Sequence, residues 1–210
     1  MSRRPSLRRN AQNFHINDDE LGYGGAKAKY KANINAVKLL KYLERNGLQA
    51  IPDQQQVLSR YVGWGGLADA FDESKQNWAA EFRELRELLT PEEYAAARAS
   101  TLNAHYTSPT VIKAIYEAVG NMGFQSGNIL EPSMGVGNFF GCLPETMQGS
   151  KLYGVELDTI TGRIAKQLYK LLKEGKICCL KVGRAYRIPK AHLFTYLCIG
   201  NQIPPAVQEA

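Results

Sequence analysis

The first half of the chain carries apolar residues at the spacing of amphipathic helices. After Ala26, apolar residues recur at steps of three, namely Ile34, Val37, Leu40 and Leu43. This spacing predicts a helix with one face on a core, and Gly47 stands where such a helix ends. Similar patterns predict further helices from Pro52 and from Asp72.

Two local signals mark helix boundaries within this stretch. Thr90 is followed by proline and, three residues after the threonine, by Glu93, which is the capping box of a helix start. The Gly63–Gly66 run (Gly-Trp-Gly-Gly) cannot continue a helix. For Trp64 we favour aromatic packing under a glycine turn over stacking on a nucleic-acid base. Residues 21–104 are therefore predicted to form a helical region without a catalytic signature.

From residue 105 the pattern changes to alternating helices and short apolar strands. Ser108 is placed to cap a helix, residues 128–130 (Asn-Ile-Leu) form a short apolar strand, and a glycine loop follows them. A second strand is expected over residues 151–158 and a helix over residues 159–169. This order is the opening of a nucleotide-binding α/β fold. The predicted class is α/β, with a partial Rossmann-like start of two parallel strands and their helices.

The glycine loop and the acids near it carry the candidate chemistry. Gly135 and Gly137 let backbone amides approach a ligand closely. The third glycine of a dinucleotide loop is absent, because Phe140 stands in its place. Glu156 ends the second strand, where an acid accepts both hydroxyls of a ribose. With Glu131, it disfavours a phosphate and favours a ligand with a cationic or neutral centre, such as S-adenosylmethionine. The alternative is a structural turn in an unrelated α/β protein.

Three segments resemble, in order, the cofactor motifs of the adenine-specific, amino-methylating DNA methyltransferases. They are residues 103–109 (Asn-Ala-His-Tyr-Thr-Ser-Pro), 129–139 (Ile-Leu-Glu-Pro-Ser-Met-Gly-Val-Gly-Asn-Phe) and 152–158 (Leu-Tyr-Gly-Val-Glu-Leu-Asp). Residues 60–69 (Arg-Tyr-Val-Gly-Trp-Gly-Gly-Leu-Ala-Asp) are similar to the lead-in of the methylase–helicase proteins of bacterial conjugative elements. The resemblance covers about residues 13–169, with Ser108 inserted in the first motif. It implies S-adenosylmethionine contacts by Tyr106, Thr107, Pro109, Glu131, Pro132, Ser133, Gly135, Gly137 and Glu156.

The chain departs from this family pattern near residue 169. The family orients the target amine with an (Asn/Asp)-Pro-Pro-aromatic loop and stacks the aromatic ring on the extruded base. The nearest substitute, residues 200–205 (Gly-Asn-Gln-Ile-Pro-Pro), separates the asparagine from the prolines and has no aromatic residue after them. We interpret it as a chance similarity. No catalytic residue is assigned, and the chain by itself is expected to be inactive as a methyltransferase.

The excess positive charge is confined to the end of the chain. The net charge is +6, and residues 161–210 alone carry nine Lys or Arg against two acids. This excess favours a polyanion partner, nucleic acid before membrane, and the alternative is a solvated basic face. Residues 171–197 resemble the second half of an excisionase-type winged-helix domain, with a two-stranded hairpin and a helix from Pro189. The resemblance implies DNA contacts by Lys176, Lys181, Arg184, Arg187 and Lys190.

Composition excludes other classes of protein. No apolar run reaches the ~18 residues of a membrane helix. The N-terminal arginines are not followed by an apolar stretch, so a secreted protein is not expected. The four cysteines lack the spacing of metal ligands, which favours reduced thiols in the cytoplasm and no metal site. Residues 1–20 are predicted to be a basic flexible arm.

We interpret the chain as a composite of the helical region, a partial S-adenosylmethionine-dependent methyltransferase domain at 105–169 and a partial winged-helix segment at 170–210. Two functions remain open. One is an adenine-N6 DNA methyltransferase of a mobile element, acting alone or with a separate chain that supplies the rest of the domain. The other is a non-catalytic, excisionase-like DNA-binding protein with a vestigial methyltransferase half. Double-stranded DNA is the expected partner of both.

Overall fold

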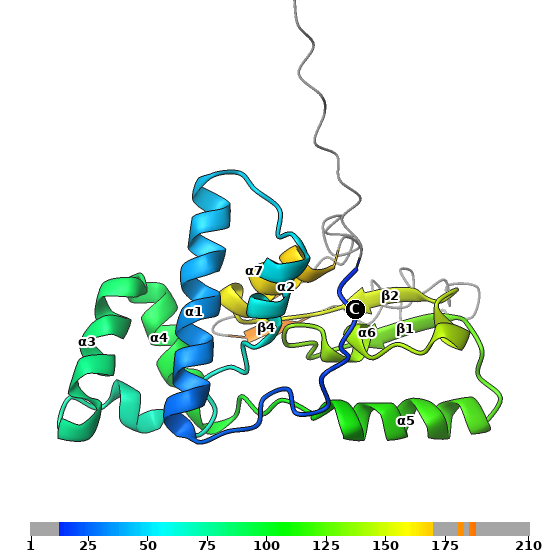
Figure 1. Ribbon diagram of the computed structural model, residues 1–210, viewed down its shortest axis with the longest axis horizontal. Helices are drawn as coiled ribbons and strands as arrows, with labels where there is room; N and C mark the ends of the chain where they lie inside the picture. The colour runs from blue at the N-terminus through cyan, green and yellow to red at the C-terminus, as the bar shows by residue number, and fades with distance from the viewer. Residues whose placement is uncertain (1–12, 170–179, 183–184, 188–210) are drawn as a thin grey trace, which may run out of the picture.

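The computed structural model describes residues 13–169, 180–182 and 185–187, and the fold is of mixed α/β class, mostly helical with a two-stranded parallel sheet. In Figure 1 the long helix α1 stands between α3 and α4 on one side and the sheet on the other. The helices are α1 (Ala26–Arg45), α2 (Pro52–Ser59), α3 (Ala79–Leu88), α4 (Pro91–Ala99), α5 (Pro109–Asn121), α6 (Asn138–Gly141) and α7 (Thr159–Leu168). The strands are β1 (Asn128–Glu131), β2 (Lys151–Gly154), β3 (Leu180–Val182) and β4 (Ala185–Arg187).

β1 and β2 pair in parallel, which confirms the expected pairing of the two strands. At their carboxyl ends Glu131 lies opposite Gly154. β2 is shorter than the predicted strand over 151–158. Val155 donates its N–H to the carbonyl of Glu131 at 2.9 Å and accepts the N–H of Met134 at 3.0 Å. After β2 the chain therefore makes hydrogen bonds to Glu131 and to the glycine loop, and it does not continue as a regular strand.

β3 and β4 pair antiparallel, with Lys181 opposite Tyr186. This pairing agrees with the two strands of the predicted hairpin, of which the structure describes 180–182 and 185–187. The remaining parts of the predicted winged-helix segment lie outside the described residues, including Lys176, Arg184, Lys190 and the helix from Pro189.

Side-chain caps begin two helices where the sequence predicts them. Thr90 Oγ1 accepts the N–H of Glu93 at 3.2 Å, and the carboxylate of Glu93 accepts the N–H of Thr90 at 3.0 Å. This reciprocal pair confirms the capping box of α4. Ser108 Oγ accepts the N–H of Val111 at 3.4 Å, so the predicted N-cap of α5 is also confirmed.

The third predicted helix begins later than the apolar spacing suggests. The carboxylate of Asp72 accepts the N–H and the hydroxyl of Ser74, at 2.9 and 2.7 Å, and holds the chain in a turn. A 3₁₀ turn over Gln76–Trp78 follows, and α3 begins at Ala79. The prediction of a start at Asp72 is therefore wrong, because local side-chain hydrogen bonds compete with the helix there.

The segment around residues 13–17 packs on the core, although it was predicted within a flexible arm. Phe14 and Ile16 are buried. Their N–H groups donate to the carbonyls of Leu168 at 3.0 Å and Gly141 at 2.8 Å. Residues two apart on an extended segment point to the same side, so both apolar side chains reach the core between α6 and α7. The rest of the predicted arm, residues 1–12, lies outside the described residues.

Aromatic rings fill the core beneath the Gly63–Gly66 run. Trp64 is 1% exposed and meets the rings of Tyr30, Tyr61 and Phe71 edge to face, with centroids 6.3, 6.1 and 5.4 Å away. Edge-to-face pairs of this kind stabilise a core beyond the area that they bury. The arrangement confirms packing as the role of Trp64, because a buried ring is not available to stack on a base.

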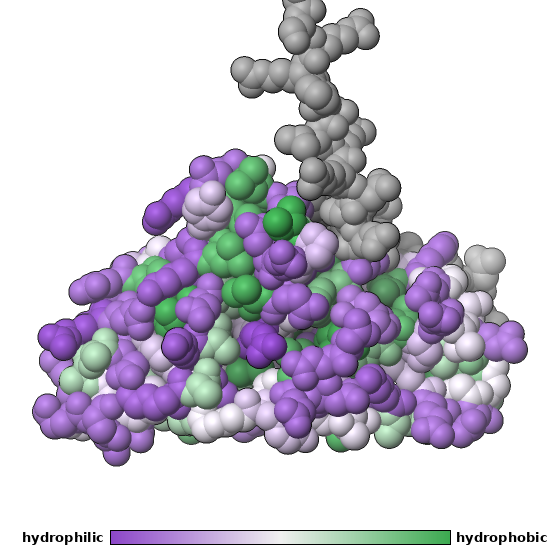
Figure 2. Space-filling model, viewed as in Figure 1, coloured by the Kyte–Doolittle hydropathy of each residue, from purple (hydrophilic) through white to green (hydrophobic). Residues whose placement is uncertain are grey.

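The face of the molecule drawn in Figure 2 is largely hydrophilic. Hydrophobic side chains are scattered among the hydrophilic ones on this face. Large exposed hydrophobic side chains near the turn from α1 to α2 are Leu48 and Ile51. In the part of the chain that the structure describes, none of the helices combines the length and the apolar content of a membrane span.

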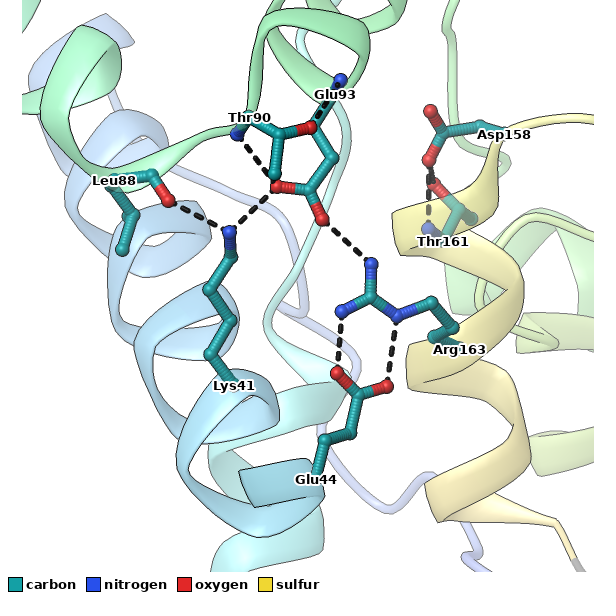
Figure 3. A network of polar contacts seen from close by, with 8 residues as sticks. All are labelled: Lys41, Glu44, Leu88, Thr90, Glu93, Asp158, Thr161 and Arg163. Carbon is teal, nitrogen blue, oxygen red and sulfur yellow. Dashed lines mark hydrogen bonds and ion pairs between the residues drawn. The ribbon is translucent and has the colours of Figure 1, made fainter.

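An ionic network joins the helical region to α7 (Figure 3). Arg163 makes two hydrogen bonds to the carboxylate of Glu44 and one, at 2.7 Å, to Glu93. Lys41 Nζ donates to the other carboxylate oxygen of Glu93 at 2.6 Å and to the carbonyl of Leu88 at 2.7 Å. Although burial opposes the charge of Glu93, the bonds from the two cations hold its pKa at about 2.

E93Q tests this network, because glutamine can keep the capping box but removes the charge. We expect the free energy of unfolding at pH 7 to fall by about 2 kcal/mol, between the values for exposed and for fully buried ion pairs. Folding lowers the pKa of Glu93 from 4.5 to about 2, so its stabilisation is present above pH 4.5 and is lost as the pH falls toward 2. In urea titrations the difference from wild type should shrink over that range.

E92Q is the matched control for this experiment, since Glu92 is exposed in the same helical turn. We expect E92Q to unfold at nearly the wild-type urea concentration at pH 7. Equal losses of stability in E92Q and E93Q would contradict a role of the network.

Candidate cofactor site

The loop between β1 and α6 bends at two glycines. Gly135 and Gly137 have φ angles of +56° and +89°, in the left-handed region that favours glycine. Gly137 donates its N–H to the carbonyl of Met134 at 2.8 Å and forms the N-cap of α6. A Cβ at Gly137 would lie 2.5 Å from the ring of Tyr169. Gly137 is therefore required by the turn and by packing.

Glu156 lies against this loop. Its carboxylate accepts the N–H of Gly135 at 2.8 Å and the N–H of Asp158 at 2.8 Å, one at each oxygen. Burial raises the pKa of Glu156, and these backbone hydrogen bonds oppose that effect. Each carboxylate oxygen can accept a second hydrogen bond, so the group can still accept the hydroxyls of a ligand.

Tyr106 is held between two glycines from distant parts of the chain. A Cβ at either Gly63 or Gly135 would lie 2.8 Å from its ring. Burial raises the pKa of Tyr106, and the carboxylates of Glu156 and Asp158 add to that effect, so the phenol is neutral at physiological pH. The sequence motifs predict Tyr106 and Gly135 as site residues but not Gly63. The signal for Gly63 is the Gly-Trp-Gly-Gly run itself, which predicted only a helix end.

A cleft of about 400 Å³ opens beside Tyr106. Residues 21–24 and Lys29 line one part of it, and residues 104–108, Gly65 and Asn138 line another. Two predicted cofactor residues, Tyr106 and Thr107, thus belong to the cleft. The amide of Asn138 donates to the backbone carbonyl of Thr107 at 3.5 Å, which links the cleft to the start of α6. The volume suits a small organic ligand or part of one.

The other seven predicted cofactor residues do not line this cleft, Gly135, Gly137 and Glu156 among them. Pro132 and Ser133 are exposed on the outer side of the loop, and Glu131 accepts the N–H of Ser133 at 3.3 Å. Pro109 is buried as the first residue of α5. The structure therefore brings together Tyr106, Gly135 and Glu156, whereas Glu131, Pro132, Ser133 and Pro109 lie around them.

Neither a metal site among the described residues nor a match to a known protein helps to identify the function of this site. Among residues 13–169 and the described parts of the hairpin, no group of three or more His, Cys, Asp or Glu side chains is placed to hold a metal ion. Comparison of the chain with protein-family models, with curated proteins and with solved structures finds no match. The geometry of the site is therefore the basis for assigning a function.

Proposed function

We propose that this chain is a cytoplasmic DNA-modification protein of a mobile element, with a site for S-adenosylmethionine like that of an adenine-N6 DNA methyltransferase. The observation that carries the proposal is that residues of three separate sequence motifs meet. Glu156 accepts the N–H of Gly135, and the ring of Tyr106 packs on the same glycine. A cofactor site of the methyltransferase type requires this convergence, since each motif contacts a different part of one ligand.

The proposed cofactor extends from the glycine loop into the cleft. Its ribose hydroxyls donate to the remaining lone pairs of Glu156. The carboxylate also favours the positive sulfonium of the ligand. The methionine part then passes Tyr106 and reaches Thr107 in the cleft. Once bound, the cofactor supplies an electrophilic methyl group, so the remaining task of a methyltransferase is to position the nucleophile.

We infer that a separate chain supplies the part that positions the target base. Within the described residues the parallel sheet has only β1 and β2, and their residues are at most partly buried. Parallel sheets are normally covered on both faces, so this one is incomplete by itself. Helix α5 also exposes Val111 and Ile115, and its C-cap residue Met122 is exposed on the same side. Both surfaces suit the remainder of a methyltransferase domain.

Double-stranded DNA is the second proposed partner, bound by the winged-helix-like tail. Support comes from the nine basic residues against two acids in residues 161–210 and from the antiparallel pairing of β3 with β4. Lys181 and Arg187 lie on these paired strands. In this proposal the residues that meet DNA phosphates are Lys176, Lys181, Arg184, Arg187 and Lys190.

Calorimetry of E156A tests the cofactor site. We expect S-adenosylmethionine to bind wild type weakly and E156A at least tenfold more weakly, since the variant loses two ribose hydrogen bonds worth about 1–2 kcal/mol each. E117A, at an exposed glutamate of α5, is the matched control and should bind as wild type does. Circular dichroism of E156A checks its fold, because Gly135 loses its hydrogen-bond partner. No heat from wild type at millimolar cofactor would contradict the proposal.

The second candidate function, a non-catalytic DNA-binding protein, is favoured by the missing (Asn/Asp)-Pro-Pro-aromatic loop. We expect the purified chain to transfer no methyl group to adenine, because nothing orients and stacks the base. Tritium transfer from labelled cofactor to DNA measures this directly, with G135D as the background control. Incorporation above that background would show that the chain is a complete enzyme.

A further inference from the structure

One lysine in the cleft has no counter-ion among the described residues. Lys29 is half-buried, lines the cleft, and makes no side-chain hydrogen bond or ion pair to any described residue. By contrast, Lys27, Lys38 and Lys41 of the same helix each pair with a glutamate at 2.6 Å. A partly desolvated ammonium group without an acid beside it favours an anionic ligand.

The lining of the cleft leaves the charge of Lys29 uncompensated. Among the described residues that line the cleft there is no Asp or Glu. The backbone of Gly22 and Gly24 lies in the same wall as Lys29.

We propose that the cleft binds an anionic group, a carboxylate or a phosphate, on Lys29 and the backbone around Gly22 and Gly24. Thr107 and Asn138 line the same cleft and supply further polar groups. Two sources have this chemistry. One is the carboxylate in the amino-acid part of S-adenosylmethionine, which rests on the proposed function. The other is a phosphate of bound DNA.

A titration with inorganic phosphate, followed by NMR of backbone amides, tests the anion site without any cofactor. We expect the amides of Gly22 and Gly24 to shift in a saturable way in wild type. In K29M the same shifts should need at least tenfold more phosphate, because the stem of the side chain remains and only the charge is lost. K31M, at an exposed lysine of the same helix, should behave as wild type. Absent shifts in wild type, or equal titrations of K29M and K31M, would overturn the proposal.

Two further measurements on K29M distinguish between the two sources of the anion. Weaker binding of S-adenosylmethionine, with unchanged binding of 5′-methylthioadenosine, which lacks the carboxylate, assigns the site to the cofactor. A fall of about one unit in the salt dependence of DNA binding, with unchanged cofactor binding, assigns it to a DNA phosphate. No change with either ligand would overturn the proposal. Failure of both adenosine compounds to bind wild type would count against the proposed function alone, because the phosphate titration is independent of it.

Discussion

Alanine in place of Gly65 is expected to destabilise the fold by about 3 kcal/mol, at the upper end of the usual cost of overpacking. The added Cβ would lie 2.0 Å from the carbonyl oxygen of Ala104, which is far inside contact distance. The position of the Cβ is fixed by the backbone and the oxygen belongs to the backbone, so no side-chain rotation relieves the overlap. The loop that contains Gly65 is also held in place. Asn33 donates to the carbonyl of Gly63 at 2.6 Å and accepts the N–H of Val62 at 2.9 Å.

G25A is the matched control for this variant. A Cβ at Gly25 would meet no atom within 4 Å, and its φ of −72° is open to any residue. We expect G25A to unfold at nearly the wild-type urea concentration and G65A to unfold at a much lower one. Similar transitions for the two variants would mean that the Gly63–Gly66 run does not pack on Ala104 as described.

Replacing Lys181, Arg184 and Arg187 together by alanine is expected to lower the slope of log affinity for duplex DNA against log salt by about two to three units. Each phosphate contact releases counterions and contributes about one unit to that slope. The three residues belong to the predicted hairpin, whose tip enters or follows a groove in winged-helix domains. Sequence preference should be slight, because the sequence pattern predicts only half of the helix-turn-helix that reads base edges.

The control is the triple alanine variant of Lys166, Lys170 and Lys173, which removes the same charge from residues that precede the hairpin. Fluorescence anisotropy over a range of salt concentrations compares the two variants. A larger loss of slope in the hairpin variant supports a wing. Equal losses would mean that only the net charge matters and that the hairpin has no special role.

Local signals predicted much of the fold. The caps at Thr90 and Ser108 depend on side chains within three residues of the helix start, so their sequence pattern carries the full physical cause. The parallel pairing of β1 and β2 followed from a strand, a glycine loop and a second strand in order. The start of α3 could not be predicted with the same accuracy. An aspartate such as Asp72 can cap a helix or stabilise a turn, and here it stabilises a turn.

The site itself depends on contacts between distant residues, which one sequence does not reveal. The close approach of Gly63 to Tyr106 joins segments more than 40 residues apart, and no local pattern specifies it. The same holds for Arg163, which pairs with Glu44 on α1, 119 positions away. The resemblance to methyltransferase motifs named Gly135 and Glu156, but only the structure gives the hydrogen bond between them.

An NMR titration with S-adenosylmethionine tests the cofactor site most directly. In the proposed complex the ligand lies on the glycine loop, in contact with Glu156 and beside Tyr106. We expect saturable shifts of the backbone amides of Gly135, Thr107 and Asp158 in wild type, and a much weaker response in E156A. Absence of shifts at these amides at millimolar cofactor, or shifts confined to other parts of the chain, would contradict this proposal.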